Sequence, residues 1–314
     1  MKKAIFRNYG NADSFEIVES PLPEPSEGEV LVKVLAAGIN PVDYKIRNGS
    51  MKWIVPMKLP HTPGGEIAGI VEKTNGTSST FQPGDQVYAM LSIKGGGYSE
   101  NLCVQEHLLC PMPKNLSFDH AAAIPLAALT ALQALRDKGK IKKGMKVLIN
   151  GASGGVGSFA VQLAKAFGAH TTTVCSEKNI EFVKSLGADY TINYQKQDFT
   201  TLQQSYDIVF DTVAKSSYKS CKKILTAKGI FISTLPDPSK ILRQLLNPIC
   251  SRNAFTIMVK PDADDLRFLN TLILNGKLNS YIESTYPLNE LSLAHKRIET
   301  GRVRGKLVIT LPHQ

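Results

Sequence analysis

The residue pattern best suited to chemistry is a run of glycines between two apolar segments, in KVLINGASGGVGSFAVQLAKAFGA (146–169). Aligned on the dinucleotide-binding fingerprint G-x-G-x-x-G, the run has Gly154 and Gly157 at the second and third glycines and Ala152 at the first. Gly154 would let the backbone approach a pyrophosphate, and Gly157 would let a helix pack closely on the preceding strand. The turn therefore predicts a cofactor site at a helix N-terminus, with a purely structural strand-to-helix turn as the alternative. Its expected contacts are Ser153, Gly154, Gly155, Val156 and Gly157.

The residues after the next expected strand, TTTVC (171–175), bear on the choice between NAD and NADP. In NAD-binding proteins a carboxylate at this place accepts hydrogen bonds from the ribose 2′-hydroxyl. Ser176 stands there instead, and Lys178 lies within reach of a 2′-phosphate. Glu177 is a complication, because a shift of one residue would restore an acid. We predict NADPH as the cofactor, with Ser176 and Lys178 among its contacts; the alternative is that Lys178 is only a solvated helix residue.

A second polar cluster follows an apolar strand-like stretch, in the segment INPVDYKIRNG (39–49). Asn40 ends the stretch, and the other polar residues come just after Pro41, which can open a helical turn. Polar side chains gathered in this way can donate hydrogen bonds to an oxygen on which negative charge collects during a reaction. The catalytic candidates are Asn40, Asp43, Tyr44 and Lys45. For Asp43, a structural role in organising the turn is an equally good interpretation.

Two kinds of segment must position these residues. From Lys2 to about His120 the chain is strand-like and rich in turns, which favours a β-rich domain. From Ala121 onward, strand-like segments alternate with helical ones, and such alternation specifies a parallel sheet covered by helices. The expected strands of this sheet are 146–150, 171–175, 189–193, 207–212 and 229–234.

The C-terminal part is expected to return to the first domain. It contains an expected helix at 262–276, a short helix at about 288–300 and a final strand at 306–310. The predicted fold class is α/β. The predicted domains are a β-rich domain of residues 1–120 plus 262–314 and a doubly wound parallel-sheet domain of residues 121–261.

Length and composition limit the class of protein. A chain of 314 residues suggests roughly two domains, and 43% apolar with 20% charged residues excludes a disordered chain. The net charge of +10 suits an anionic partner, such as nucleic acid, a membrane surface or a phosphate-bearing cofactor. The basic runs 138–146 and 296–306 have no interleaved aromatic residues, so we expect solvated faces there and consider nucleic acid a poor candidate.

The spacing of the cysteines and histidines indicates neither a metal site nor a set of disulfide bonds. The five cysteines contain no C-x-x-C, so we expect reduced, mostly buried thiols, and the six histidines are expected at the surface or at caps. No apolar run approaches the ~18 residues of a membrane span, so we expect a soluble cytoplasmic protein and no membrane partner. The apolar loop MKWIVPMKLP (51–60) would either cap the core, which is the commoner arrangement, or form a wall over a hydrophobic substrate.

These motifs together resemble the medium-chain dehydrogenase/reductase superfamily, specifically its zinc-independent quinone oxidoreductase and enone reductase branch. The resemblance covers essentially the whole chain, and it implies a GroES-like catalytic domain, a Rossmann domain, NADPH in a cleft between them, and commonly a homodimer. The motifs that carry it are AAGINPVDYKIRNG (36–49), PGGEIAGIVE (63–72), FQPGDQVYA (81–89), GGGYSE (95–100), AAAIPLAALTALQAL (121–135), NGASGGVGSFAVQLAK (150–165), SLGADYTINY (185–194) and RGKLVI (304–309).

The resemblance also implies roles for single residues. Asn40 and Gly65 stand where the alcohol dehydrogenases of this superfamily have two ligands of the catalytic zinc, so no metal is expected. Glu66 remains, but one carboxylate cannot supply the three protein ligands of a catalytic zinc. By resemblance, Lys45 can reach the nicotinamide ribose or the substrate carbonyl, and Tyr44 can line the pocket.

Further cofactor contacts are implied in the same way. Thr130 matches a position that contacts the nicotinamide carboxamide, and Tyr194 and Arg304 match positions near the adenosine phosphate end or the cofactor cleft. The implied function is NADPH-dependent hydride transfer to a small hydrophobic quinone or α,β-unsaturated carbonyl. The alternatives are a non-catalytic relative that binds NADPH or RNA and a zinc-type alcohol dehydrogenase, which Asn40 and Gly65 argue against.

Overall fold

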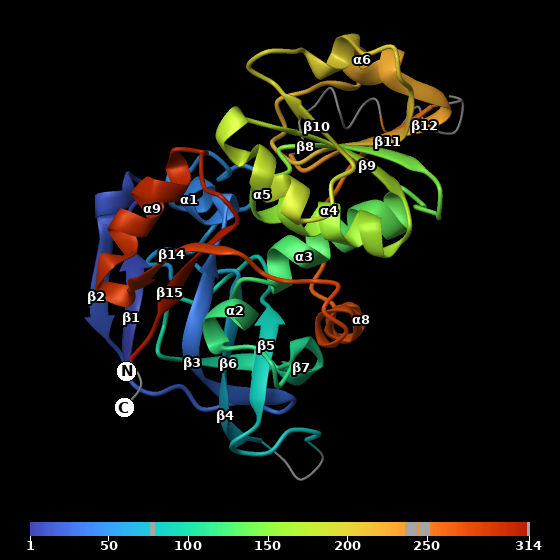
Figure 1. The fold of residues 1–314 in the computed structure, drawn as a ribbon. Helices are drawn as coiled ribbons and strands as arrows, with labels where there is room; N and C mark the ends of the chain where they lie inside the picture. The colour runs from blue at the N-terminus through green and yellow to red at the C-terminus, as the bar shows by residue number, and fades with distance from the viewer. Residues whose placement is uncertain (76–78, 236–243, 245–251, 313–314) are drawn as a thin grey trace. The chain divides into compact units, whose positions relative to one another are not determined.

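A computed structural model describes residues 1–75, 79–235, 244 and 252–312 (Figure 1). The chain divides into two compact units. The first contains Met1–Leu126, Lys260–Gly276 and Ser280–Gln314, and the second contains Ala127–Val259 and Lys277–Asn279. The expectations for Cys250 and His313 lie outside the described residues.

A seven-stranded sheet forms the frame of the first unit. Its order is β14-β15-β3-β4-β5-β7, and β6 also pairs with β3. The strands are β3 (Glu29–Ile39), β4 (Glu66–Thr74), β5 (Gln86–Met90), β6 (Asn101–Gln105), β7 (Cys110–Pro111), β14 (Ile282–Pro287) and β15 (Lys306–Thr310). A separate pair is formed by β1 (Lys2–Phe6) and β2 (Phe15–Glu19). The C-terminal strand β15 runs antiparallel to β3, with Leu307 opposite Ile39.

Strand β3 is central to this unit because it is apolar and buried along almost its whole length. Its side chains pack with residues of β4, β5 and α9 in one hydrophobic core. The helices of the unit are α1 (Pro41–Arg47), α2 (Phe118–Ala122), α8 (Ala263–Leu274) and α9 (Leu291–Glu299), with short turns at Ala12–Ser14, Glu106–Leu108 and Leu288–Glu290. Burial of apolar surface stabilises the folded chain by about 25 cal/mol per Å². The buried side chains of β3 therefore hold this strand in place, including its end, where α1 begins.

The second unit contains a six-stranded parallel sheet in the order β10-β9-β8-β11-β12-β13. The chain moves outward from β8 to β10 and then returns to the other side of β8, which is the doubly wound order of a Rossmann sheet and confirms the predicted parallel sheet. The strands are β8 (Lys146–Asn150), β9 (His170–Cys175), β10 (Tyr190–Asn193), β11 (Tyr206–Asp211), β12 (Leu225–Ser233) and β13 (Asn253–Thr256). In such sheets, ligands bind at the carboxyl ends of the strands near the reversal.

Helices precede and connect these strands (Figure 1). The longer ones are α3 (Pro125–Leu132), continued by a π-helical stretch (Gln133–Lys138), and α4 (Gly155–Ala166). The shorter ones are α5 (Ile180–Ser185), α6 (Tyr218–Cys221), and single turns at Glu177–Asn179, Phe199–Thr201 and Lys222–Ile224. Among the described residues, no helix is long and apolar enough to cross a membrane.

Candidate active site

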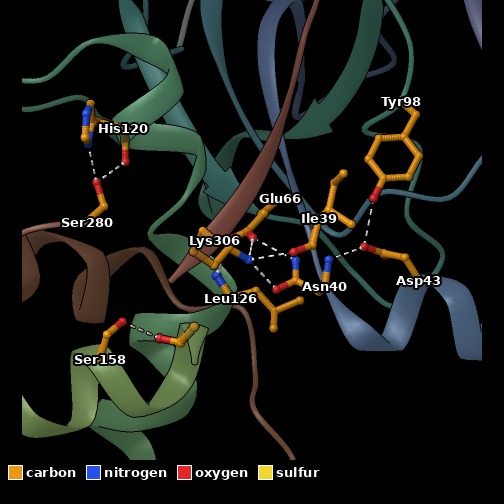
Figure 2. A network of polar contacts seen from close by, with 11 residues as sticks. Ile39, Asn40, Asp43, Glu66, Tyr98, His120, Leu126, Ser158, Ser280 and Lys306 are labelled. Carbon is orange, nitrogen blue, oxygen red and sulfur yellow. Dashed lines mark hydrogen bonds and ion pairs between the residues drawn. The ribbon is translucent and has the colours of Figure 1, made fainter. Parts of the chain in front are cut away.

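The start of helix α1 is held by the carboxylate of Asp43. Asn40 precedes the helix, and its backbone N–H donates to Asp43 Oδ2 at 2.8 Å. The hydroxyl of Tyr98 donates to the same oxygen at 2.9 Å, as Figure 2 shows. The pKa of Asp43 is raised to about 6, because the rise caused by burial exceeds the lowering by the hydrogen bonds from Asn40 and Tyr98. These contacts favour the structural interpretation of Asp43, which organises the turn that carries Asn40.

A buried ammonium group lies next to Asn40. Lys306 Nζ donates to Ile39 O at 2.9 Å, to Asn40 Oδ1 at 2.5 Å and to Glu66 Oε1 at 2.7 Å (Figure 2). Asn40 Nδ2 also donates to Glu66 Oε1, at 2.7 Å. The side chains of Lys306 and Glu66 are 3% and 0% exposed, so this is a buried ion pair. The backbone pairing of β15 with β3 brings Lys306 to this place.

Glu66 is the centre of this polar network. Its second oxygen, Oε2, accepts the N–H of Leu126 at 2.7 Å, in the first turn of α3. Gly38 leaves room for the carboxylate, because a Cβ at this position of β3 would clash with Glu66 Oε1 and with the carbonyl oxygen of Ala122. The glycine of the AAGIN motif is therefore required by the close approach of Glu66, a requirement that one sequence alone does not reveal.

The other two catalytic candidates lie on α1 outside this network. Lys45 is half-buried, and burial lowers the pKa of its ammonium group below the usual 10.5. Among the described residues, no carboxylate forms an ion pair with Lys45, so its donors are available to a ligand. Tyr44 packs against the hydrophobic core of the first unit, where burial and the nearby charge of Glu299 raise its pKa. The structure thus joins Asn40 and Asp43 directly and leaves Lys45 as the unpaired cation of α1.

Two expectations from the sequence are wrong here. His295 is fully buried against the rings of Phe15 and Tyr98, rather than at the surface or at a cap. Burial and the charge of Arg47 lower its pKa to about 3, so it is neutral at physiological pH. The loop 51–60 does not bury its largest apolar side chains in the core, because Trp53 is 89% exposed and Ile54 is 61% exposed.

The glycine turn of the second unit is open at Gly154 and crowded at Gly157. Gly154 precedes α4 in an extended conformation that any residue can adopt, and a Cβ there would have Gly151 O at 3.6 Å as its nearest neighbour. The protein itself therefore does not require glycine at 154, whereas an approaching ligand would. At Gly157 a Cβ would clash with Gly151 O and Ala152, so this glycine serves the packing of α4 on the turn. The residues present fit a dinucleotide cofactor at this turn.

The end of β9 lies beside this turn. The amide of Asn179 donates to Ser153 Oγ at 2.9 Å and to Ser176 Oγ at 3.4 Å, which ties the glycine turn to the position expected to face the ribose. Glu177 instead pairs with Lys196 at 2.9 Å and accepts a hydrogen bond from Asn193 at the end of β10. Its carboxylate is thus occupied by partners of its own.

The remaining predicted cofactor residues are placed as follows. Lys178 is exposed in the turn after β9. Tyr194 is also exposed, and its backbone N–H donates to Cys175 O at 3.1 Å, which places it at the same edge of the sheet. Thr130 is buried in α3. Arg304 belongs to the first unit, where its backbone N–H donates to Glu283.

Sequence reasoning missed Lys306, Tyr98 and His295 as members of the buried surroundings of α1. For Lys306 the local signal was a lysine at the start of an apolar strand, in RGKLVI. For Tyr98 it was the run of glycines before it. The pairing of Lys306 with Asn40 spans 266 residues of sequence, and nothing near either residue marks it.

Comparison with known families matches most of the chain. Residues 26–114 match the family described as "Alcohol dehydrogenase GroES-like domain", and residues 186–309 match "Zinc-binding dehydrogenase". The predicted α/β fold with a GroES-like domain and a Rossmann domain is therefore confirmed.

Individual relatives are similar over nearly their full length. The chain is 34% identical to the chloroplast envelope quinone oxidoreductase homolog of Arabidopsis thaliana, over 96% of this chain and 95% of that protein. It is 33% identical to the chloroplastic NADPH-dependent alkenal/one oxidoreductase of Arabidopsis thaliana, over 98% of this chain and 79% of that protein. The solved structure of the quinone oxidoreductase from Coxiella burnetii superposes with a TM-score of 0.90 at 33% identity, over 99% of each chain.

The name of one matched family implies zinc, and the donor set of this chain does not fit it. A catalytic zinc needs three protein ligands, taken from Cys, His, Asp and Glu. The described residues contain no group of three such side chains that could hold a metal. The one carboxylate of the expected place, Glu66, is already bound to the ammonium group of Lys306 and to the amide of Asn40. A divalent cation there would have to displace a buried positive charge.

Proposed function

The chain belongs to the medium-chain dehydrogenase/reductase superfamily and is an oxidoreductase of that type, and on this basis we propose that it transfers hydride from NADPH to quinones or α,β-unsaturated carbonyls without a metal. The observation that carries the proposal is the buried ion pair of Lys306 and Glu66, because it leaves this carboxylate bound to a cation of the chain itself. Oxidation of a simple alcohol needs a group that lowers the pKa of the hydroxyl, and a metal is the usual one. Conjugated acceptors have no such need.

Three features of the second unit support NADPH as the cofactor. The packing of the protein does not require a glycine at position 154, and Gly154 leaves space there for a pyrophosphate. Ser176 takes the place of the ribose acid, and the carboxylate of Glu177 is engaged by Asn193 and Lys196. Lys178 carries an exposed ammonium group that suits a 2′-phosphate. The relative named as an NADPH-dependent alkenal/one oxidoreductase agrees with this proposal.

The chemistry would divide between cofactor and protein. When bound, NADPH would supply a hydride ion, which the β-carbon of an enone or a quinone ring would accept. The C=C electrons of the substrate then move to its oxygen, and Lys45 or backbone N–H groups stabilise the resulting oxyanion. Solvent or Tyr44 supplies one proton, so that one NADPH and one proton reduce one acceptor. Thr130, Tyr194 and Arg304 are proposed as further cofactor contacts.

Lys45 suits the oxyanion role for two physical reasons. It lies on α1, whose first turn is fixed by Asn40 and Asp43, so its backbone is held in place. Its side chain is half-buried, which lowers the pKa of the ammonium group and makes its hydrogen bond to an oxyanion stronger than in bulk water. Asn40 is proposed to contribute to catalysis indirectly, because it helps to hold the start of α1, the helix that carries Lys45.

We also propose a homodimer in a reducing, cytoplasmic compartment. The described cysteines Cys103, Cys110, Cys175 and Cys221 are all free, which suits reducing conditions. The dimer is proposed by analogy with the superfamily, and its molar mass in solution, from light scattering, tests it.

The experiment that tests the proposed reaction follows NADPH oxidation with three acceptors under identical conditions. The pairs are NADPH with an enone, NADPH with a quinone, and NADP⁺ with a primary alcohol. We expect turnover with the enone or the quinone and much slower alcohol oxidation. Robust alcohol oxidation beside inert enones and quinones would overturn the proposal.

A further inference from the structure

The ammonium group of Lys306 has an acceptor for each of its three protons. These are the backbone carbonyl of Ile39, the side-chain carbonyl of Asn40 and the carboxylate of Glu66, at 2.9, 2.5 and 2.7 Å from Nζ. Lysine is almost never fully buried unless it is paired. Three oxygens from two neighbouring strand ends converge on one point, and a positive charge of the chain itself occupies that point (Figure 2).

We propose that Lys306 is a fixed cation in the place of a metal ion, and that it is a positioning residue for hydride transfer, acting through Asn40 and Glu66. The inference rests on the proposed function, because positioning has meaning only for a reaction at this site. It goes further by assigning a role to a residue at the far end of the chain, on β15.

The first positioning effect is on the amide of Asn40. Its oxygen accepts from Lys306 and its nitrogen donates to Glu66, so the charges on the two neighbours leave one amide orientation. An amide turned by 180° would place its NH₂ group against the ammonium and its oxygen against the carboxylate. Asn40 precedes α1, and Lys45 follows on the same helix. The fixed cation thereby holds the start of the helix that carries the proposed oxyanion donor.

The second positioning effect is on α3. Glu66 uses Oε1 for Lys306 and Asn40, and it uses Oε2 for the N–H of Leu126 in the first turn of α3. A carboxylate is favourable at a helix N-terminus, where N–H groups have no partner within the helix. Thr130, proposed to contact the nicotinamide, lies on this helix. The same ion pair thus anchors the starts of both helices that carry proposed substrate and cofactor contacts.

The energetics of a buried pair dictate the choice of variants. Removing one partner leaves an uncompensated buried charge, which is strongly destabilising, whereas replacing both partners by neutral groups can be close to neutral for stability. Lys306→Ala therefore tests whether a cation is needed at this point. The double variant Glu66→Gln/Lys306→Met tests whether the pair positions the site when folding is preserved.

The first experiment is rescue of Lys306→Ala by an added cation, read on the thermal midpoint. The substitution removes the atoms from Cγ to Nζ, which correspond to n-propylammonium. We expect a lowered midpoint that n-propylammonium raises again, and no effect of tetramethylammonium, which has the charge but no N–H donor. Turnover is not used here, because free amines add to enones and quinones. Lys296→Ala, which removes an exposed lysine paired with Asp13, is the matched control and should not respond.

The second experiment measures Glu66→Gln/Lys306→Met in the full chain. We expect a thermal midpoint near that of the parent and a kcat lowered about tenfold or more, because small misplacements of reacting groups cost this much. A purely structural pair would leave kcat unchanged in a variant that folds. A stable double variant with the kcat of the parent would overturn the proposal, and so would a Lys306→Ala variant with the parent's midpoint and kcat. If Lys306→Ala does not fold, the double variant decides.

The experiments distinguish a failure of this inference from a failure of the proposed function. If the parent reduces neither quinones nor enones, the proposed function fails, whereas the effect of n-propylammonium on the midpoint still tests whether a cation is needed beside Glu66. If the parent is active and the double variant keeps full kcat, only the inference about Lys306 fails.

Discussion

Replacing Lys178 by alanine is predicted to weaken the binding of NADPH and to spare NADH. Lys178 is exposed in the turn after β9, beside Ser176, and the described residues offer it no carboxylate partner. A hydrogen bond between an ammonium group and a phosphate contributes about 1.5–3 kcal/mol. Because Lys178 is exposed to water and salt, we expect the loss to lie near the lower end of that range, which corresponds to about a tenfold rise in Kd.

The assay is a titration of both cofactors into the parent and the Lys178→Ala variant at low and high ionic strength. The Kd for NADPH should rise in the variant, the Kd for NADH should not change, and the difference should shrink in high salt. Lys184→Ala is the control, because Lys184 is exposed in the same unit and pairs with Glu181. Equal losses for both cofactors would refute the reasoning, because they would assign Lys178 to folding rather than to the 2′-phosphate.

Glu177→Gln completes this test. Because Lys196 and Asn193 already bind the carboxylate of Glu177, its neutralisation should leave the affinity for NADH unchanged. A selective loss of NADH affinity would place Glu177 at the ribose and would remove the argument for NADPH.

Three further predictions concern the first unit. Lys45→Ala should lower kcat by up to ~10²-fold with little change in KM, as for loss of one oxyanion donor; steady-state kinetics check this, and a rise in KM alone would contradict it. Gly38→Ala should lower the free energy of unfolding by about 1–3 kcal/mol in a urea titration, because the new Cβ displaces Glu66; parent-like stability would be inconsistent with the crowding at β3. His295 has its pKa lowered from 6.5 to about 3, so the unfolded chain binds a proton that the folded chain does not. Stability should therefore fall as the pH drops below about 6.5, by at most about 1.4 kcal/mol per pH unit from this residue, and His295→Leu should flatten that slope in urea titrations at several pH values.

Local sequence patterns predicted much of the parallel sheet, because strands such as β8 and β11 are short apolar runs and helix α4 begins directly after a glycine turn. The strand Lys146–Asn150 and the glycine turn after it lie where the sequence predicts them. Strand β12 begins at Leu225, four residues before the expected 229, and the pairing of Leu225 with Tyr206 of β11 extends the strand across the exposed residues Ala227 and Lys228. Pairing between strands that are distant in the sequence cannot be predicted from a short stretch of residues.

The candidate site was predictable only in part, for the same reason. Asn40 and Asp43 could be found because they surround Pro41 at the end of an apolar strand. Lys306 could not be found, because its role depends on the antiparallel pairing of β15 with β3 and on the burial of Glu66 at the start of β4, on the other side of β3. A lysine that begins a strand is usually solvated, and only the three-dimensional pairing makes this one a buried cation.

The central claim is that this oxidoreductase works without a metal ion, and the most direct measurement is the zinc content of active protein. The protein is purified without a chelator, its zinc is quantified by mass spectrometry, and NADPH-dependent turnover of a quinone and an enone is measured before and after prolonged dialysis against EDTA. We predict far less than one zinc per chain and the same turnover after dialysis, because Lys306 already neutralises Glu66. One tightly held zinc per chain, whose removal abolishes turnover, would contradict it.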